Sequence, residues 1–186
     1  MLKTMTTTTI MLLICGAAAI ADEKQQAFFQ SLKNICGNSY LGTVVKSNES
    51  DTSWREAKIV IHTPPCDQDM SKEIRIPLHV GADKSRTWII SKTETGLRLK
   101  HDHRHSDGTP DAVSMYGGDT VDSGTTNQQN FPVDDFSKAL FLENGLDVSI
   151  TNVWRLSVEN AHLSYRLSRP GRLFQVDFDL SKPIKN

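Results

Sequence analysis

Three histidines occupy alternate positions in one short stretch of the sequence. His101, His103 and His105 follow Leu97 and Leu99 with the same two-residue spacing. In an extended strand, residues two positions apart lie on the same face. Because the leucines indicate a buried face, we expect the row of imidazoles to continue toward a cavity or its rim.

Histidines on such a face could bind a small molecule by hydrogen-bonding its polar or anionic groups. Two tryptophans in predicted strands could line the same pocket, although tryptophans also pack in cores. An arginine beside one of them would add a charge if it points inward. The candidate ligand-binding residues are His101, His103, His105, Trp88, Trp154 and Arg155. The leading prediction is therefore a small-molecule-binding protein with histidines at the mouth of its pocket.

The same histidines could instead hold a divalent transition metal. Neighbouring imidazoles on one strand face lie about 6.6 Å apart, which allows two of them to share one ion. His101, His103 and His105 together span about 13 Å, so His103 with one neighbour would need a third ligand from another strand. A metal-binding protein or a metal-dependent hydrolase is the alternative function.

A third interpretation needs no pocket. The imidazoles would hydrogen-bond across strands, with Asp102 and Arg104 paired on the solvent face, in an envelope protein with a structural or interaction role. The sequence contains no Gly-x-Ser-x-Gly nucleophile elbow, no glycine-rich phosphate loop and no dinucleotide fingerprint. No catalytic residue is predicted, and the question of enzymatic activity is left open.

The N-terminus has the pattern of a secretory signal peptide. Lys3 is the only charged residue in the first 21 positions, and an apolar stretch covers residues 10–20. This pattern predicts cleavage after Ala21 and export to the periplasm or the medium. No later segment approaches the ~20 apolar residues of a membrane span. The expected organisation is a removed signal peptide, 1–21, and a single β-rich domain, 22–186.

Two cysteines, Cys36 and Cys66, remain after that cleavage. In an exported protein such an even pair predicts one disulfide. The formal net charge of the chain is −1, and no basic run is interleaved with aromatic residues. These properties argue against nucleic acid or an anionic membrane as the partner. A small molecule is the expected partner, and the oligomeric state is not indicated.

Alternating apolar and polar residues predict a mostly β protein with antiparallel strands. The predicted strands are 40–46, 57–62, 73–80, 87–92, 97–105, 112–116, 147–156, 162–167 and 173–180. Helices are predicted at 23–36 and at 134–143, where Asp134 or Asp135 would be the N-cap. Residues 117–130 read as one irregular segment. Because closure removes exposed edge strands, we expect an antiparallel barrel, with a β-sandwich as the alternative.

Several segments resemble those of a family of uncharacterised exported bacterial proteins. They are LKHDHRHSDG at 99–108, MYGGDT at 115–120, NVW at 152–154 and RPGR at 169–172. The resemblance implies export in a cell of the Gram-negative type and implies no activity. The order of an N-terminal helix, antiparallel strands and a late short helix is similar to that of lipocalin-like (calycin-like) barrels. Those barrels have Gly-x-Trp in the first strand, where this chain has Val44 in place of the tryptophan.

Overall fold

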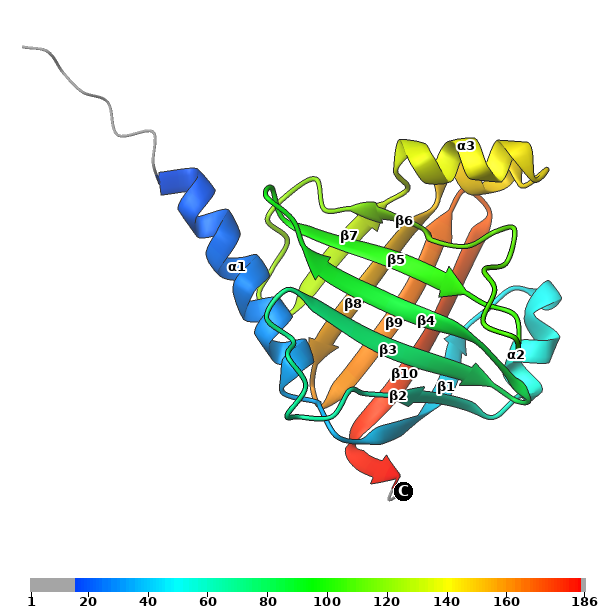
Figure 1. Ribbon diagram of the computed structural model, residues 1–186, viewed down its shortest axis with the longest axis horizontal. Helices are drawn as coiled ribbons and strands as arrows, with labels where there is room; N and C mark the ends of the chain where they lie inside the picture. Colours follow the sequence, from blue (N-terminus) through cyan, green and yellow to red (C-terminus); the bar gives the residue numbers. More distant parts are fainter. Residues whose placement is uncertain (1–15, 185–186) are drawn as a thin grey trace, which may run out of the picture.

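Ten strands form one antiparallel sheet that curves round into a barrel (Figure 1). The computed structural model describes residues 16–184. Strands β1 to β6 pair in chain order, as do β7 to β10; β1 also pairs with β10, and the sheet ends at β6 and β7. The strands are β1 (Ser39–Lys46), β2 (Ile59–His62), β3 (Glu73–Val80), β4 (Asp83–Lys92), β5 (Leu97–His103), β6 (Tyr116–Asp119), β7 (Gln128–Pro132), β8 (Val153–Glu159), β9 (His162–Arg169) and β10 (Arg172–Ile184).

The barrel closes where the two ends of the sheet, β6 and β7, approach each other. Gly118 of β6 forms an antiparallel bridge with Val133, which directly follows β7. The amide of Asp134 donates a hydrogen bond of 3.0 Å to the carbonyl of Gly117. One nearly closed sheet therefore surrounds one interior. The expected barrel is confirmed, and the sandwich alternative is wrong because there are not two separate sheets.

Both glycines of β6 are required, Gly118 by this seam and Gly117 by the pairing of β6 with β5. A Cβ atom on Gly118 would lie 1.7 Å from the carbonyl oxygen of Pro132. A Cβ atom on Gly117 would lie 1.9 Å from the carbonyl oxygen of Leu99. Both obstacles are backbone atoms of neighbouring strands, which cannot move aside without disturbing the sheet. Only glycine therefore lets the backbones approach this closely.

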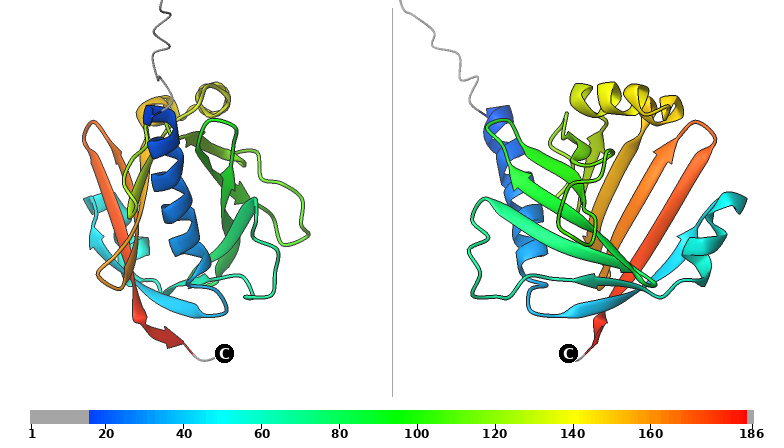
Figure 2. Two further views of the ribbon diagram at one scale, coloured as in Figure 1. Left: turned by 90° about the vertical axis from the view of Figure 1, so that its left-hand side faces the viewer. Right: turned by 45° about the vertical axis from the view of Figure 1, so that its right-hand side comes forward.

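One end of the barrel is covered by α1 (Gly16–Lys33), which runs across it (Figure 2). Phe28 and Leu32, one turn apart on the same face of the helix, are at most 1% exposed. A disulfide between Cys36 and Cys66, whose Cα atoms are 5.1 Å apart, connects the chain after α1 to the loop after β2. The predicted N-terminal helix and the predicted disulfide are both confirmed.

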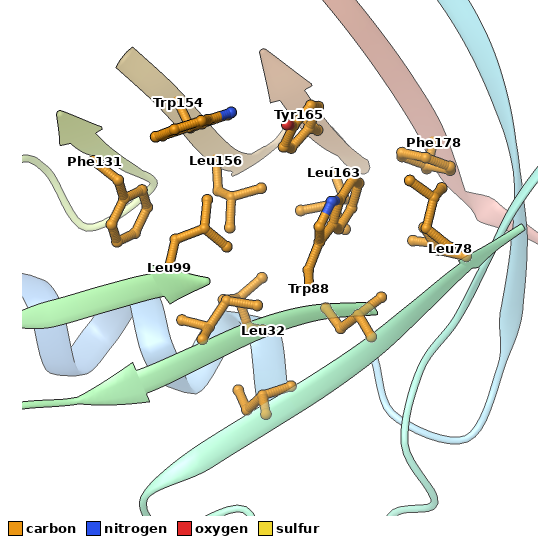
Figure 3. Packing of buried hydrophobic residues seen from close by; sticks show 14 of the residues in the cluster. Leu32, Leu78, Trp88, Leu99, Phe131, Trp154, Leu156, Leu163, Tyr165 and Phe178 are labelled. Carbon is orange, nitrogen blue, oxygen red and sulfur yellow. The ribbon is translucent and has the colours of Figure 1, made fainter. Parts of the chain in front are cut away.

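Apolar side chains from opposite walls of the barrel meet in its interior (Figure 3). Leu99 of β5 lies across from Phe131 of β7 and Leu156 of β8, and all three are at most 1% exposed. Burying a side chain of this size contributes about 1.5–3 kcal/mol. This part of the interior is filled, and together with α1 it forms the hydrophobic core.

The opposite end of the barrel, called the mouth below, is bordered by short helical segments. These are η1 (Glu49–Asp51), α2 (Thr52–Glu56), α3 (Asp135–Glu143) and η2 (Asp147–Thr151). The predicted late helix is confirmed as α3, and the side chain of Asp134 caps it by accepting the Ser137 amide at 2.8 Å. The helix lies over the rim of the barrel (Figure 1).

Three of the expected segments differ from the structure. Residues 112–116 are not a strand, because Met115 has a φ of 60° and β6 begins only at Tyr116. The segment 117–130 contains most of β6 and the start of β7, which have few β-branched residues and depend on pairing with their neighbours. Residues 147–151 form η2 before β8 begins.

Export is not decided by the fold. Within residues 16–184, no helix combines the length and the apolar character needed to cross a membrane. Of the predicted signal peptide, residues 1–15 lie outside the described residues, and 16–21 form the first part of α1. Cleavage and export therefore stay predictions.

The seam generates a test of the barrel closure. Replacing Gly118 by alanine should lower the free energy of unfolding by about 3 kcal/mol or more, because the new methyl group overlaps the backbone of β7. Gly108→Ala is the control: it also replaces a glycine, but no atom lies within 4 Å of the added Cβ and only its φ of 86° is unfavourable. That control should cost about 1–2 kcal/mol. Equal losses in urea denaturation of the two variants would contradict this account of the closure.

Candidate functional site

A cavity of about 350 Å³ lies inside the barrel toward the mouth. Its walls come from the sheet, α2, α3, η2 and the loop between β5 and β6. The volume falls near the lower end of the ~300–1,000 Å³ typical of small-molecule sites. Aromatic rings form much of the wall, from Trp54, Trp88, Tyr116, Trp154, Tyr165 and Phe174.

The inward-facing side chains of four strands change character along the barrel. Each row begins with apolar residues in the core and ends with a histidine or an arginine at the cavity. The rows are Leu97, Leu99, His101 and His103 on β5; Ile90, Trp88 and Arg86 on β4; Leu163, Tyr165, Leu167 and Arg169 on β9; and Phe178, Val176, Phe174 and Arg172 on β10. Because side chains alternate between the two faces of a strand, the inward face of each strand lines the core at one end and the cavity at the other.

His101 lies at the boundary between the core and the cavity, and it is 3% exposed. Its Nδ1 donates to the carbonyl oxygen of Tyr116 at 3.2 Å, because a carbonyl can only accept. Its Nε2 therefore accepts from the hydroxyl of Tyr165, at 2.9 Å. The ring also stacks on Tyr116, with centroids 4.7 Å apart. These contacts hold a neutral imidazole in one orientation.

The surroundings disfavour a charge on either histidine of the cavity. Burial lowers the pKa of His101 from 6.5 to about 3, despite the opposing hydrogen bond to Tyr116. Burial, and then the positive charge of Arg86, lowers the pKa of His103. Nε2 of His103 is 3.1 Å from the hydroxyl of Tyr116. Both imidazoles are therefore uncharged polar groups at neutral pH.

The aromatic rings form three groups around the cavity, one of which is the pair of Tyr116 and Trp154 with centroids 5.8 Å apart. Trp88 stacks on Tyr165 with centroids 4.5 Å apart and an interplanar angle of 12°. Nearer the mouth, Trp54 of α2 meets the ring of Phe174 edge-on at 5.1 Å. The guanidinium of Arg86 lies over the Trp54 ring, 5.4 Å from its centroid. Stacked and edge-on rings are rigid surfaces suited to a flat apolar ligand.

Three arginines line the cavity, and their partners differ. Arg172 pairs with both carboxylate oxygens of Asp51, at 2.5 and 2.7 Å. Arg86 forms an ion pair with Asp83. Arg169 donates from Nη1 to the side-chain oxygen of Asn152 at 2.9 Å.

The structure brings together four of the six candidate ligand-binding residues. His101, His103, Trp88 and Trp154 all line the cavity. His105 is exposed, because β5 ends at His103 and the alternation does not continue into the following loop.

Arg155 lies outside the cavity, on the outer face of β8, where its Nε donates to Asn130 at 2.8 Å. Trp154 takes the inward position on that strand, so its neighbour Arg155 points outward. Asp102 and Arg104 are paired at 2.9 Å, as the third interpretation expected, but Asp102 is buried and does not lie on a solvent-exposed face.

The candidate metal ligands do not converge. Among residues 16–184, no group of three His, Cys, Asp or Glu side chains is placed to hold an ion. His101 has protein partners at both nitrogens, and His105 lies apart in the loop. The set His101, His103 and His105 is therefore not assembled as a metal site.

Arg86, Arg169 and Arg172 are functional candidates that the sequence reasoning missed. Each one continues an alternating apolar row by one more step, in the way that His103 continues the row of leucines. That periodicity was a signal available from the sequence. Their meeting at one mouth depends on the pairing of β10 with β1 and β9, which the sequence does not show.

Comparisons with protein-family models, with curated proteins and with solved structures found no match to this chain. The resemblance to exported bacterial proteins therefore stays an expectation.

The buried neutral His101 generates a prediction about pH. Above pH 6.5 its imidazole is neutral in the folded and the unfolded chain. Below pH 6.5 the unfolded chain takes up a proton that the folded chain rejects until about pH 3, so folding stability falls as the pH falls. We expect His101→Gln, which keeps a donor and an acceptor, to lose less stability than wild type between pH 6.5 and 5.

The measurement is urea denaturation of both proteins at several pH values in that interval. The free energy of unfolding of wild type should fall more steeply, by about 1 kcal/mol per pH unit for one proton. His79 and His103, whose pKa values burial also lowers, are present in both proteins and cancel in the comparison. Parallel curves would show that His101 titrates normally in the folded state.

Proposed function

We propose that this protein is an exported barrel that binds a small molecule in the cavity at its mouth. The observation that carries the proposal is the cavity of about 350 Å³. The cavity lies at the mouth of a barrel whose interior near α1 is filled by packed apolar side chains. Concave, largely apolar sites with a few fixed polar groups are typical of small-molecule binding.

The polar groups of the cavity support this function because most of them are already held in place. His101 is oriented by Tyr116 and Tyr165, and Arg172 by Asp51. Groups fixed before binding lose little conformational entropy when a ligand arrives. The site is thus preorganised for one arrangement of polar contacts around an apolar ligand.

Export is supported by two independent features. The first 21 residues have the charge and hydropathy pattern of a signal peptide. The disulfide between Cys36 and Cys66 is of a kind that persists in oxidising compartments such as the periplasm. We therefore place the proposed binding function outside the cytoplasm.

The other two functions have less support. A metal-dependent function needs converging ligands, which residues 16–184 do not provide. A purely structural role would suit a filled barrel, whereas this interior contains a cavity lined by aromatic rings. Neither alternative explains the rigid aromatic surfaces at the mouth.

Binding can be tested with N-phenyl-1-naphthylamine, a neutral dye whose fluorescence rises in apolar sites. We expect saturable binding with one site per protein chain. Leu167→Trp should weaken it about tenfold or more, because Leu167 lines the cavity and the larger ring would occupy ligand volume. Fluorescence titration at fixed protein concentration measures both affinities.

Ser164→Trp is the matched control, since it adds the same ring to the outer face of β9, the strand that carries Leu167. This control should bind the dye as wild type does. If wild type shows no saturable binding, or if Leu167→Trp binds with wild-type affinity, the cavity is not a ligand site.

A further inference from the structure

The hairpin between β9 and β10 brings two cations to the mouth of the cavity. Arg169 and Arg172 occupy directly paired positions across the Pro170-Gly171 turn. Side chains in such positions lie on the same face, and like charges there repel each other. Both arginines line the cavity, so the hairpin concentrates positive charge at one side of its mouth.

Only one of these two charges is neutralised by the protein. The carboxylate of Asp51 binds Arg172 through both oxygens. Arg169 has the neutral amide of Asn152 as its partner, and within residues 16–184 no carboxylate lies within ion-pair distance of it. Its Nε and Nη2 groups have no acceptor in that part of the chain.

Asp111, the acidic side chain in the cavity wall, forms no ion pair with Arg169. Asp111 belongs to the loop between β5 and β6, where it accepts the amide of Val113 at 2.8 Å and acts on His103. By contrast, burial and then the positive charge of Arg172 lower the pKa of Arg169. Arg169 is therefore a partly buried cation whose charged neighbour has the same sign.

Such an arrangement favours the binding of an anion. A partly buried charge without a counterion costs free energy. Asp51 is taken up by Arg172, so it leaves the charge of Arg169 without a counterion. A guanidinium offers planar N–H donors that match the two oxygens of a carboxylate or a phosphate. The Nε and Nη2 donors of Arg169 suit an anionic group at one end of a ligand, and the aromatic walls of the same cavity suit an apolar body at the other end.

We infer that the ligand of this cavity has an anionic group, a carboxylate or a phosphate, bound by Arg169 at the mouth, and a flat apolar body that lies against the aromatic walls. This inference rests on the proposed function, because it names the class of ligand for the same cavity. It assigns binding of the anion to Arg169, whereas Arg172 and Arg86 are already paired with carboxylates of the protein.

Two dyes with a common skeleton test the inference. 1-Anilinonaphthalene-8-sulfonate has the skeleton of N-phenyl-1-naphthylamine with one added sulfonate, so the ratio of their affinities reports the contribution of the negative charge. In Arg169→Gln we expect affinity for the sulfonate dye to fall about tenfold or more. Affinity for the neutral dye should stay unchanged, which also shows that the variant is folded.

Two further variants are the controls. Arg166→Gln removes the same charge from the opposite face of β9 and should leave both affinities unchanged. Arg169→Lys retains the positive charge and should recover part of the lost affinity for the sulfonate dye. Displacement of the sulfonate dye by 2-naphthoate and by 2-naphthyl phosphate, each compared with neutral naphthalene, then distinguishes a carboxylate ligand from a phosphate ligand.

The outcomes separate this inference from the proposed function. If neither dye binds wild type, the binding function itself fails. If the neutral dye binds but the sulfonate dye does not, or if Arg169→Gln weakens both dyes equally, the cavity binds small molecules without selecting anions. Equal displacement by naphthalene and by both of its anionic derivatives would likewise overturn the inference.

Discussion

The close approach of β6 to β7 is the constraint on which the rest of the structure depends. Only glycine at position 118 leaves room for the carbonyl group of Pro132 on β7. Closure at this seam makes a single sheet surround a single interior, so the inward faces of distant strands share one space. Without it the cavity would be open on one side, between β5 and β8, where His101 and Trp154 now lie 5.1 Å apart, ring to ring.

Within the closed barrel, the packed core and the cavity are lined by different kinds of side chain. Near α1 the inward residues are mostly aliphatic or aromatic and are buried against one another, with the amide of Gln129 as a buried polar exception. Toward the mouth the same rows end in His103, Arg86, Arg169 and Arg172, whose polar heads cannot pack against one another without cost. The three arginine charges are instead spaced around a cavity, with Asp83 as the counterion of Arg86 and Asp51 as that of Arg172. The cavity is thus a consequence of where the rows change from apolar to basic.

Much of the secondary structure could be read from local patterns. Alternation predicted β3, β9 and β10, because each has one buried and one exposed face. The cap at Asp134 predicted the start of α3. The reading failed at β6 and β7, where glycines, glutamines and a proline have low intrinsic strand propensity and pairing with neighbouring strands determines the conformation. It also extended β5 to His105, because periodicity alone does not show where a strand leaves the sheet.

The sequence by itself determined the fold class, the disulfide between Cys36 and Cys66, and the inward direction of His101 and His103. These follow from spacing along one strand or from cysteine number, which need no knowledge of distant neighbours. Only the tertiary structure decided that Arg86 lies over Trp54, that Arg169 and Arg172 line the same cavity, and that Arg155 points away. The physical reason is that a cavity is bounded by strands far apart in the chain. Their register and closure are set by the summed packing of the whole barrel and not by any local pattern.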